Sequence, residues 1–106
     1  MIGNGPTGGC GMGLLTSDEI TQALAGMPGW EREGDAIARQ FSLEGGFMGS
    51  VGFVNRLADA AEAADHHPDL AISWNRVTVT LSTHSAGGVT DKDIALAREA
   101  DRLANG

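Results

Sequence analysis

Apolar residues recur every three or four positions in three stretches of the chain, as they do on the buried face of a helix. The first stretch follows Thr16 and Glu19, which have the spacing of a capping box, and it ends near Gly26. The last stretch begins after Thr90, with Asp93 three residues further on as a second capping pair. We expect the inner face of this last helix to include Ile94, Ala97, Leu103 and Ala104.

The middle stretch, residues 47–65, predicts the longest helix. Its buried stripe is expected to consist of Phe47, Val51, Val54, Ala58 and Ala61. The opposite side, facing water, is expected to carry Asn55, Asp59, Glu62 and His66. Pro68 disfavours helical geometry at His67, so the helix should end near His66.

Between the helices the pattern changes to strict alternation, which is typical of strands. Residues 30–43 predict a hairpin around Gly34-Asp35, and residues 70–84 predict a second hairpin with its turn near Asn75. Apolar residues of the last strand alternate with polar ones, as in a sheet covered on one side. The sequence therefore predicts an α+β two-layer domain, with a four-stranded antiparallel sheet and helices packed on one face, in the order αββαββα.

Composition and charge indicate the extent of the domain, the partners that are disfavoured and the expected location of the protein. Residues 1–13 hold six glycines and predict a disordered tail or an added leader, which leaves residues 14–106 as one domain. A net charge of −7 without a basic patch argues against a nucleic-acid partner. No apolar run is long enough for a membrane span and no signal peptide is evident, so we expect no membrane association and a cytoplasmic location. One cysteine excludes an internal disulfide.

The three histidines, His66, His67 and His84, fall at the ends of predicted elements, where functional sites are often built. In the last turn of a helix, and with Glu62 one turn earlier, His66 is placed to be protonated and to act as a general acid. The alternative is that it only complements the helix end. His84 is predicted to end a strand. Neighbouring residues at a helix end point in different directions, so we expect no metal at this pair.

The stretch "EAADHHPDLAISWNRVTVTLSTHSAGGVTDKDIALA", residues 62–97, resembles the signature of the pterin-4a-carbinolamine dehydratases. The resemblance extends over about residues 15–103 and rests on Glu62, His66-His67-Pro68, Trp74, His84 and Asp93. Two features depart from the family: Leu70 and Ala71 stand where an aromatic residue is common, and "GGFMGSVGF" is rich in glycine.

The resemblance implies dehydration of 4a-hydroxytetrahydropterin to quinonoid dihydropterin and water. This chemistry needs an acid and a base but no metal, redox cofactor or other cofactor. We expect His66 and His84 to be the principal acid/base pair, with His67 contributing. Substrate contacts are expected from Glu62, Asp65, Pro68, Ser82, Thr83 and Asp93.

Other functions remain open at this point. Some relatives bind proteins or act as assembly factors without catalysis, and a zinc hydrolase would rest on the histidine count alone. The complete histidine set favours the enzyme. Open edge strands, like the resemblance, favour a homodimer or a homotetramer.

Overall fold

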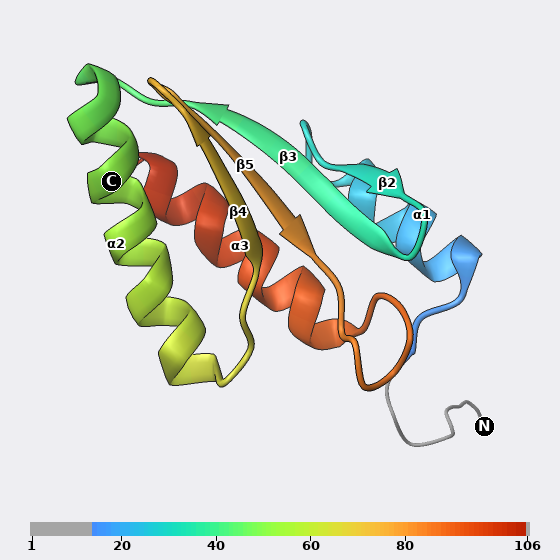
Figure 1. Cartoon of the computed structure of the whole chain (residues 1–106). Helices are drawn as coiled ribbons and strands as arrows, with labels where there is room; N and C mark the ends of the chain where they lie inside the picture. Colours follow the sequence, from blue (N-terminus) through green and yellow to red (C-terminus); the bar gives the residue numbers. More distant parts are fainter. Residues whose placement is uncertain (1–13, 106) are drawn as a thin grey trace.

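The computed structural model describes residues 14–105, so the predicted tail lies outside the described part of the chain. Three helices and four strands follow one another in the predicted order αββαββα (Figure 1). These elements are α1 (Ser17–Ala25), β2 (Glu31–Glu33), β3 (Ala36–Ser42), α2 (Gly46–Ala64), β4 (Asp69–Ser73), β5 (Arg76–Leu81) and α3 (Asp91–Asn105). No helix within residues 14–105 combines the length and the apolar character that crossing a membrane would require.

The four strands form one antiparallel sheet in the order β2-β3-β5-β4. Two hairpins build it, and their inner strands β3 and β5 pair along six residues at the centre. The first hairpin turns at Gly34, whose φ of 59° suits a glycine at the first position of a tight turn. The helices lie together behind the sheet (Figure 1), which confirms the α+β prediction.

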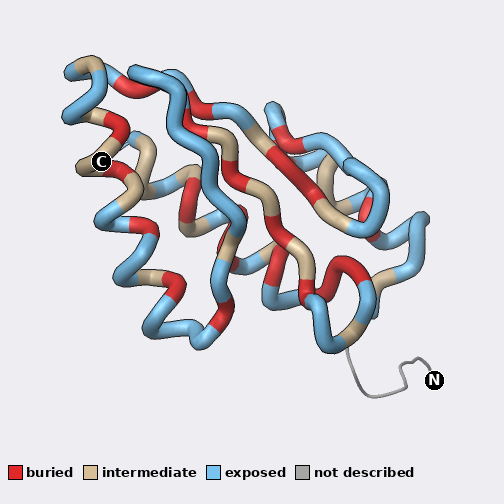
Figure 2. The backbone as a smooth tube through the Cα atoms, in the orientation of Figure 1, coloured by how far each residue is buried: buried red, intermediate tan, exposed pale blue. Residues whose placement is uncertain are grey.

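The core lies between the sheet and the helices, where Figure 2 shows buried residues on the central strands and on the inward sides of α2 and α3. The apolar face predicted for β5 is fully buried and consists of Val77, Val79 and Leu81. It packs with Ile37 and Phe41 of β3, and Trp30 lies edge-on to Phe41 with a ring distance of 6.0 Å.

The buried stripe predicted for α2 is only partly correct: Ala61 is buried and Val54 packs half-buried against the core. The other buried residues of α2 are Ser50, Phe53 and Leu57, whereas the predicted Phe47 is half exposed. Apolar residues occur nearly all round this helix, so spacing alone did not define its inner side. Ser50 is buried because its hydroxyl donates to the Trp74 carbonyl at 2.5 Å.

The inner side predicted for α3 is partly confirmed. Ala97 is buried, and the other three predicted residues pack half-buried against the core. Leu96 and Ala100 are also buried, although the prediction did not include them.

Two element ends differ from the prediction, and both affect the histidines. Helix α2 ends at Ala64 because Asp65 takes a left-handed conformation with φ 52°, so His66 lies outside the helix. Strand β5 ends at Leu81, so His84 lies in the following loop and not at the end of the strand.

Candidate active site

All three histidines line one hollow of about 280 Å³ at the end of the sheet where β4 begins and β5 ends. Three segments contribute to it: the α2–β4 turn, the loop after β5 and the first turn of α3. The lining residues are Asp65, His66, His67, Ser82, Thr83, His84, Ser85 and Lys92.

The turn at Asp65 directs His66 inward. The His66 backbone N–H donates to the Ala61 carbonyl at 3.0 Å, which holds this residue beneath the end of α2. Its side chain is only about one-tenth exposed. The prediction that His66 lies on the water-facing side of α2 is therefore wrong. The helix ends at Ala64, two residues before His66, so His66 does not follow the helical path.

Asp93 of α3 holds the His66 ring from behind. Its Oδ1 lies 2.5 Å from His66 Nε2, and its Oδ2 accepts from Thr83 Oγ1 and from the Thr90 backbone N–H, both at 2.9 Å. Asp93 is fully buried and does not line the hollow. The carboxylate predicted to contact substrate thus lies one layer deeper, where it contacts a histidine.

A chain of hydroxyl groups fixes this carboxylate. The Thr83 and Thr90 hydroxyl oxygens lie 2.7 Å apart, and the Lys92 backbone N–H donates to Thr90 at 3.3 Å. Because Thr83 donates to Asp93, the Thr90 hydroxyl must donate to Thr83. From the sequence, Thr90 was predicted only to cap α3, and its spacing to Asp93 was the one signal that it has a role here.

Glu62 was expected to lie beside His66, but it pairs with His67 instead. Its Oε2 hydrogen-bonds His67 Nε2, and both side chains are exposed. The left-handed turn at Asp65 turns the chain away from the helical path along which Glu62 and His66 would be neighbours. Each histidine of the pair therefore has its own carboxylate, one buried and one exposed.

His84 lies across the hollow in a tight loop. The Thr83 carbonyl accepts from the backbone N–H groups of Ala86 and Gly87 at 3.0 and 2.9 Å, and Thr83 N–H donates to the Gly88 carbonyl at 2.8 Å. Gly87 has φ 79°, which this turn needs. The His84 side chain is exposed at the tip of the loop.

Six of the nine predicted site residues line the hollow, and Glu62, Pro68 and Asp93 do not. Two lining residues, Ser85 and Lys92, were missed. Lys92 adjoins the predicted capping residue Asp93, but its contribution to the hollow depends on how α3 meets the loop after β5, which local pattern does not reveal. Within residues 14–105, no cluster of three or more His, Cys, Asp or Glu side chains is arranged to hold a metal ion.

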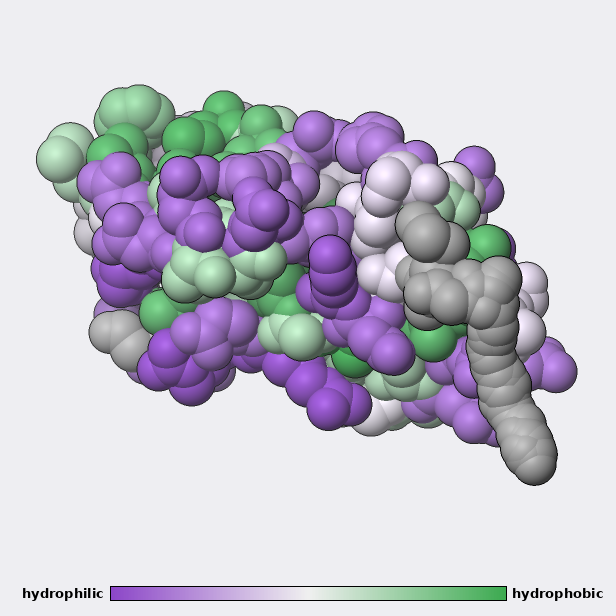
Figure 3. Space-filling model, turned by 90° about the horizontal axis from the view of Figure 1, so that it is seen from below, coloured by the Kyte–Doolittle hydropathy of each residue, from purple (hydrophilic) through white to green (hydrophobic). Residues whose placement is uncertain are grey.

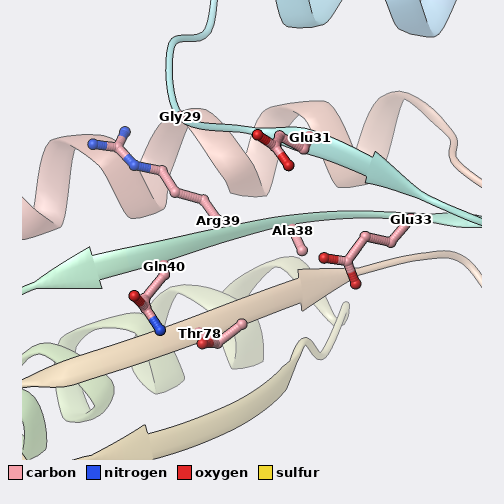
Figure 4. A pocket seen from close by; sticks show the side chains of 7 residues that line it. All are labelled: Gly29, Glu31, Glu33, Ala38, Arg39, Gln40 and Thr78. Carbon is pink, nitrogen blue, oxygen red and sulfur yellow. The ribbon is translucent and has the colours of Figure 1, made fainter.

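Another hollow, of about 420 Å³, lies on the outer face of the sheet (Figure 4). Glu31 and Glu33 lie along it, but the Arg39 guanidinium binds Asp101 at 2.8 Å in the helix layer. Its lining includes no histidine. The histidines therefore gather at the first hollow and not at this one.

Comparison with known proteins shows which family the chain belongs to. The family model of pterin 4 alpha carbinolamine dehydratase matches residues 13–103. The chain belongs to this family. Relatives that carry the family's name in Mycobacteroides abscessus and Thermosynechococcus vestitus are each 53% identical over 90 residues, which are 85% of this chain and 95% and 94% of the relatives.

Two solved structures also match this dehydratase-family chain. A transcriptional coactivator/pterin dehydratase from Brucella melitensis is 41% identical, with a TM-score of 0.81 over 85% of this chain and 97% of that chain. A pterin dehydratase-like RuBisCO assembly factor of the alpha-carboxysome is 20% identical, with a TM-score of 0.59 over 73% of this chain and 88% of that chain. The second likeness concerns the fold alone.

Proposed function

We propose that this member of a hydro-lyase family dehydrates 4a-hydroxytetrahydropterin to quinonoid dihydropterin and water, with histidines as acid and base. The observation that supports it best is the convergence of His66, His67 and His84 on one hollow, with carboxylates behind two of them. Membership of the family supports the pterin as substrate.

The reaction itself needs little besides proton transfer. The carbon that loses its hydroxyl group already bears a ring nitrogen, whose lone pair forms a C=N bond as the C–O bond breaks. An acid protonates the departing oxygen to give water, and a base removes a proton from the pterin. Positioned histidines are suited to both steps.

His66 has one ring nitrogen assigned by its contacts. A carboxylate can only accept hydrogen bonds, so Nε2 carries the proton that faces Asp93. Nδ1 is then the ring nitrogen that serves the substrate, and in the neutral ring it is an acceptor. Asp93 would act as a positioning residue because it holds His66, and Thr90 would support it because its backbone N–H donates to Asp93; both lie outside the hollow.

His84 would act from the opposite wall, since it comes from the loop after β5 while His66 and His67 come from the α2–β4 turn. Asp65, Ser82, Ser85 and Lys92 present polar groups to the hollow and would bind the polar edge of the pterin, while Pro68 would fix the backbone that follows His67.

Dehydration of 4a-hydroxytetrahydropterin by the purified chain tests the proposal. His66→Ala and His84→Ala should each lower kcat by about a hundredfold or more, the low end expected for losing an acid/base group. Asp59→Ala, an exposed change on α2, is the matched control and should leave kcat unchanged. Full activity in both histidine variants would refute the assignment.

A non-catalytic protein-binding or assembly-factor role is the alternative. An inactive wild-type chain that still folds would favour it. Loss of activity with a chelator, restored by zinc, would instead favour a metal enzyme.

We also expect a homodimer or homotetramer, because strand β4 is an open edge whose residues are all exposed. A cytoplasmic location stays a prediction from the sequence.

A further inference from the structure

A further hollow adjoins the one that holds the three histidines, the histidine hollow. It measures about 420 Å³ and lies between the last turns of α2 and the first half of α3. Figure 3 looks onto the side of the molecule where α2 ends and α3 begins, and moderately hydrophobic, pale green surface lies there between hydrophilic residues. We name it the alanine hollow, because its apolar lining consists of Ala60, Ala63, Ala64, Ala95 and Leu96.

The two hollows meet at two places. Lys92 lines both of them. Ala64 lines the alanine hollow, and the next residue, Asp65, lines the histidine hollow. A lysine carries its charge at the end of a flexible apolar stem, so the stem can border one hollow while the ammonium group reaches the other. The end of α2 and the start of α3 thus form a common border of the two hollows.

The linings of the two hollows differ in chemistry. Every residue that lines the histidine hollow has a polar or charged side chain, whereas the alanine hollow has only Lys92 and Glu99. Both oxygens of Glu99 accept hydrogen bonds from the Arg102 guanidinium, which lowers the pKa of the Glu99 carboxyl. Since this carboxylate is already paired, the alanine hollow suits a neutral, apolar group better than a cation.

The histidine hollow alone is small for a substituted pterin. Its volume of about 280 Å³ lies just below the roughly 300–1,000 Å³ that ligand pockets usually have. A substituent on the bicyclic ring therefore needs space beyond this hollow. The alanine hollow offers that space directly beside it.

The position of the reacting carbon determines where such a substituent begins. In a pterin substituted at carbon 6, only the ring nitrogen N5 separates that carbon from carbon 4a, which loses the hydroxyl group. Because carbon 4a must lie beside the histidines, the substituent begins beside them too. His66 follows directly after Ala64 and Asp65, at the border of the two hollows. A substituent that leaves the ring on this side enters the alanine hollow, and the polar edge of the ring then faces Ser82 and Ser85.

We propose that the alanine hollow binds an apolar substituent on carbon 6 of the pterin and so determines which tetrahydropterins this enzyme prefers. The inference rests on the proposed function, since it takes a pterin as the substrate. Short alkyl chains are the class of substituent that fits, because the small alanine side chains leave room and contribute only methyl groups to the contact.

Calorimetric titration with fully oxidised pterins measures binding without turnover. 6-Propylpterin has a longer chain than 6-methylpterin by two methylene groups, and burial of each contributes about fourfold in affinity. We expect 6-propylpterin to bind about tenfold more tightly, less than full burial would give, because Ala63, Ala64 and Ala95 are exposed. Equal Kd values for the two pterins would overturn the proposal.

Filling the alanine hollow tests where the chain binds. Ala95→Leu places a larger apolar side chain in the lining and keeps a good helix former, and Ala63→Leu does the same from α2. Each should abolish the preference for 6-propylpterin over 6-methylpterin. Ala58→Leu is the matched control, because Ala58 is exposed on α2 but does not line the hollow, and it should keep the preference. A preference that survives in both filled variants would contradict the assignment.

Sedimentation distinguishes a substrate site from a contact between proteins. Ala63→Leu and Ala95→Leu should have the same oligomeric state as the wild-type chain. If either variant changes that state and leaves the preference between the two pterins intact, the hollow is a protein contact and the proposal is wrong.

Turnover separates this inference from the proposed function. The kcat/KM for dehydration should be about tenfold higher for the 6-propyl substrate than for the 6-methyl substrate, and Ala95→Leu should remove the difference. A binding preference without any turnover would refute only the catalysis. Turnover with equal kcat/KM for both substrates would refute only the role of the alanine hollow. Failure of both pterins to bind would refute the two proposals together.

Discussion

Oδ1 of Asp93 lies 2.5 Å from Nε2 of His66, and the carboxylate has no exposure to solvent. Every oxygen of this carboxylate has a donor, because Thr83 and the Thr90 backbone occupy Oδ2. A buried carboxylate that is fully hydrogen-bonded fixes the rotation and the tautomer of the ring it contacts. The geometry of His66 is therefore set by α3, far along the chain from the His-His-Pro motif.

Asp93→Asn should preserve the fold and impair catalysis. The amide oxygen must replace Oδ2 to accept from Thr83 and Thr90, so the amide NH₂ group faces His66 and reverses its tautomer. We expect kcat to fall by at least about tenfold, because a ring in the wrong tautomer cannot serve the substrate. Nitrogen NMR shifts of His66 would report the tautomer, and circular dichroism the fold.

The outcome that contradicts this prediction is a normal tautomer combined with a large loss of activity. Asp93 would then contribute through its charge and not by positioning. Asp93→Ala is a less informative variant, because it would leave the Thr83 hydroxyl and the Thr90 N–H unsatisfied and destabilise the fold by roughly 2–4 kcal/mol.

Thr90→Val should destabilise the protein and loosen His66. It removes the hydroxyl that donates to Thr83 and accepts from the Lys92 N–H at the start of α3. We expect a loss of about 1–2 kcal/mol in the free energy of unfolding, from urea titration. Thr90→Ser keeps the hydroxyl and should recover both stability and kcat. If the serine variant behaves like the valine variant, the methyl group matters and the hydroxyl does not.

Glu62→Gln should have a much smaller effect on stability. Its partner His67 is exposed, and ion pairs of this kind contribute about 0–1 kcal/mol. We expect the free energy of unfolding to change by less than about 0.5 kcal/mol. Asp59→Asn removes a comparable exposed charge one turn earlier on α2 and serves as control. A drop in kcat for Glu62→Gln, absent in the control, would show that His67 needs its carboxylate.

Sequence pattern predicted the fold well because each element carries its own signal. Alternation defined β5, and cap spacing defined the starts of α1 and α3. The helix face of α2 was misjudged because small apolar residues surround it and because the buried Ser50 is polar. The hydroxyl of Ser50 donates to the Trp74 carbonyl, and this partner lies 24 residues further along the chain.

Six of the nine predicted site residues line one hollow, but the hydrogen-bond partners of the histidines were not predicted correctly. Glu62 and Asp93 were both singled out in the sequence. Which histidine each carboxylate contacts depends on Asp65, whose left-handed conformation ends α2 early. Aspartate tolerates this conformation better than most residues, but the sequence did not reveal that it adopts it here. The contact between His66 and Asp93 of α3 joins residues 27 positions apart, so the local spacing of apolar and polar residues does not predict it.

The glycine-rich start of α2 supplies a last prediction, in which two glycines should respond in opposite directions. A Cβ at Gly49 would lie 1.9 Å from the Glu44 carbonyl oxygen, which is backbone and cannot move without shifting the entry to the helix. At Gly52 a Cβ would meet only the Arg56 guanidinium tip at 3.4 Å. Gly49→Ala should therefore cost about 2–4 kcal/mol of unfolding free energy, as steric clashes in packed regions do.

Gly52→Ala should instead stabilise the protein by roughly 0.5–1 kcal/mol, because alanine is the better helix former and its methyl group has room. Urea unfolding of the two variants side by side measures the difference. Since both sit inside the same helix and gain the same methyl group, helix propensity cancels between them. A similar stability for both would show that the chain enters α2 differently, with the Glu44 carbonyl turned away from Gly49.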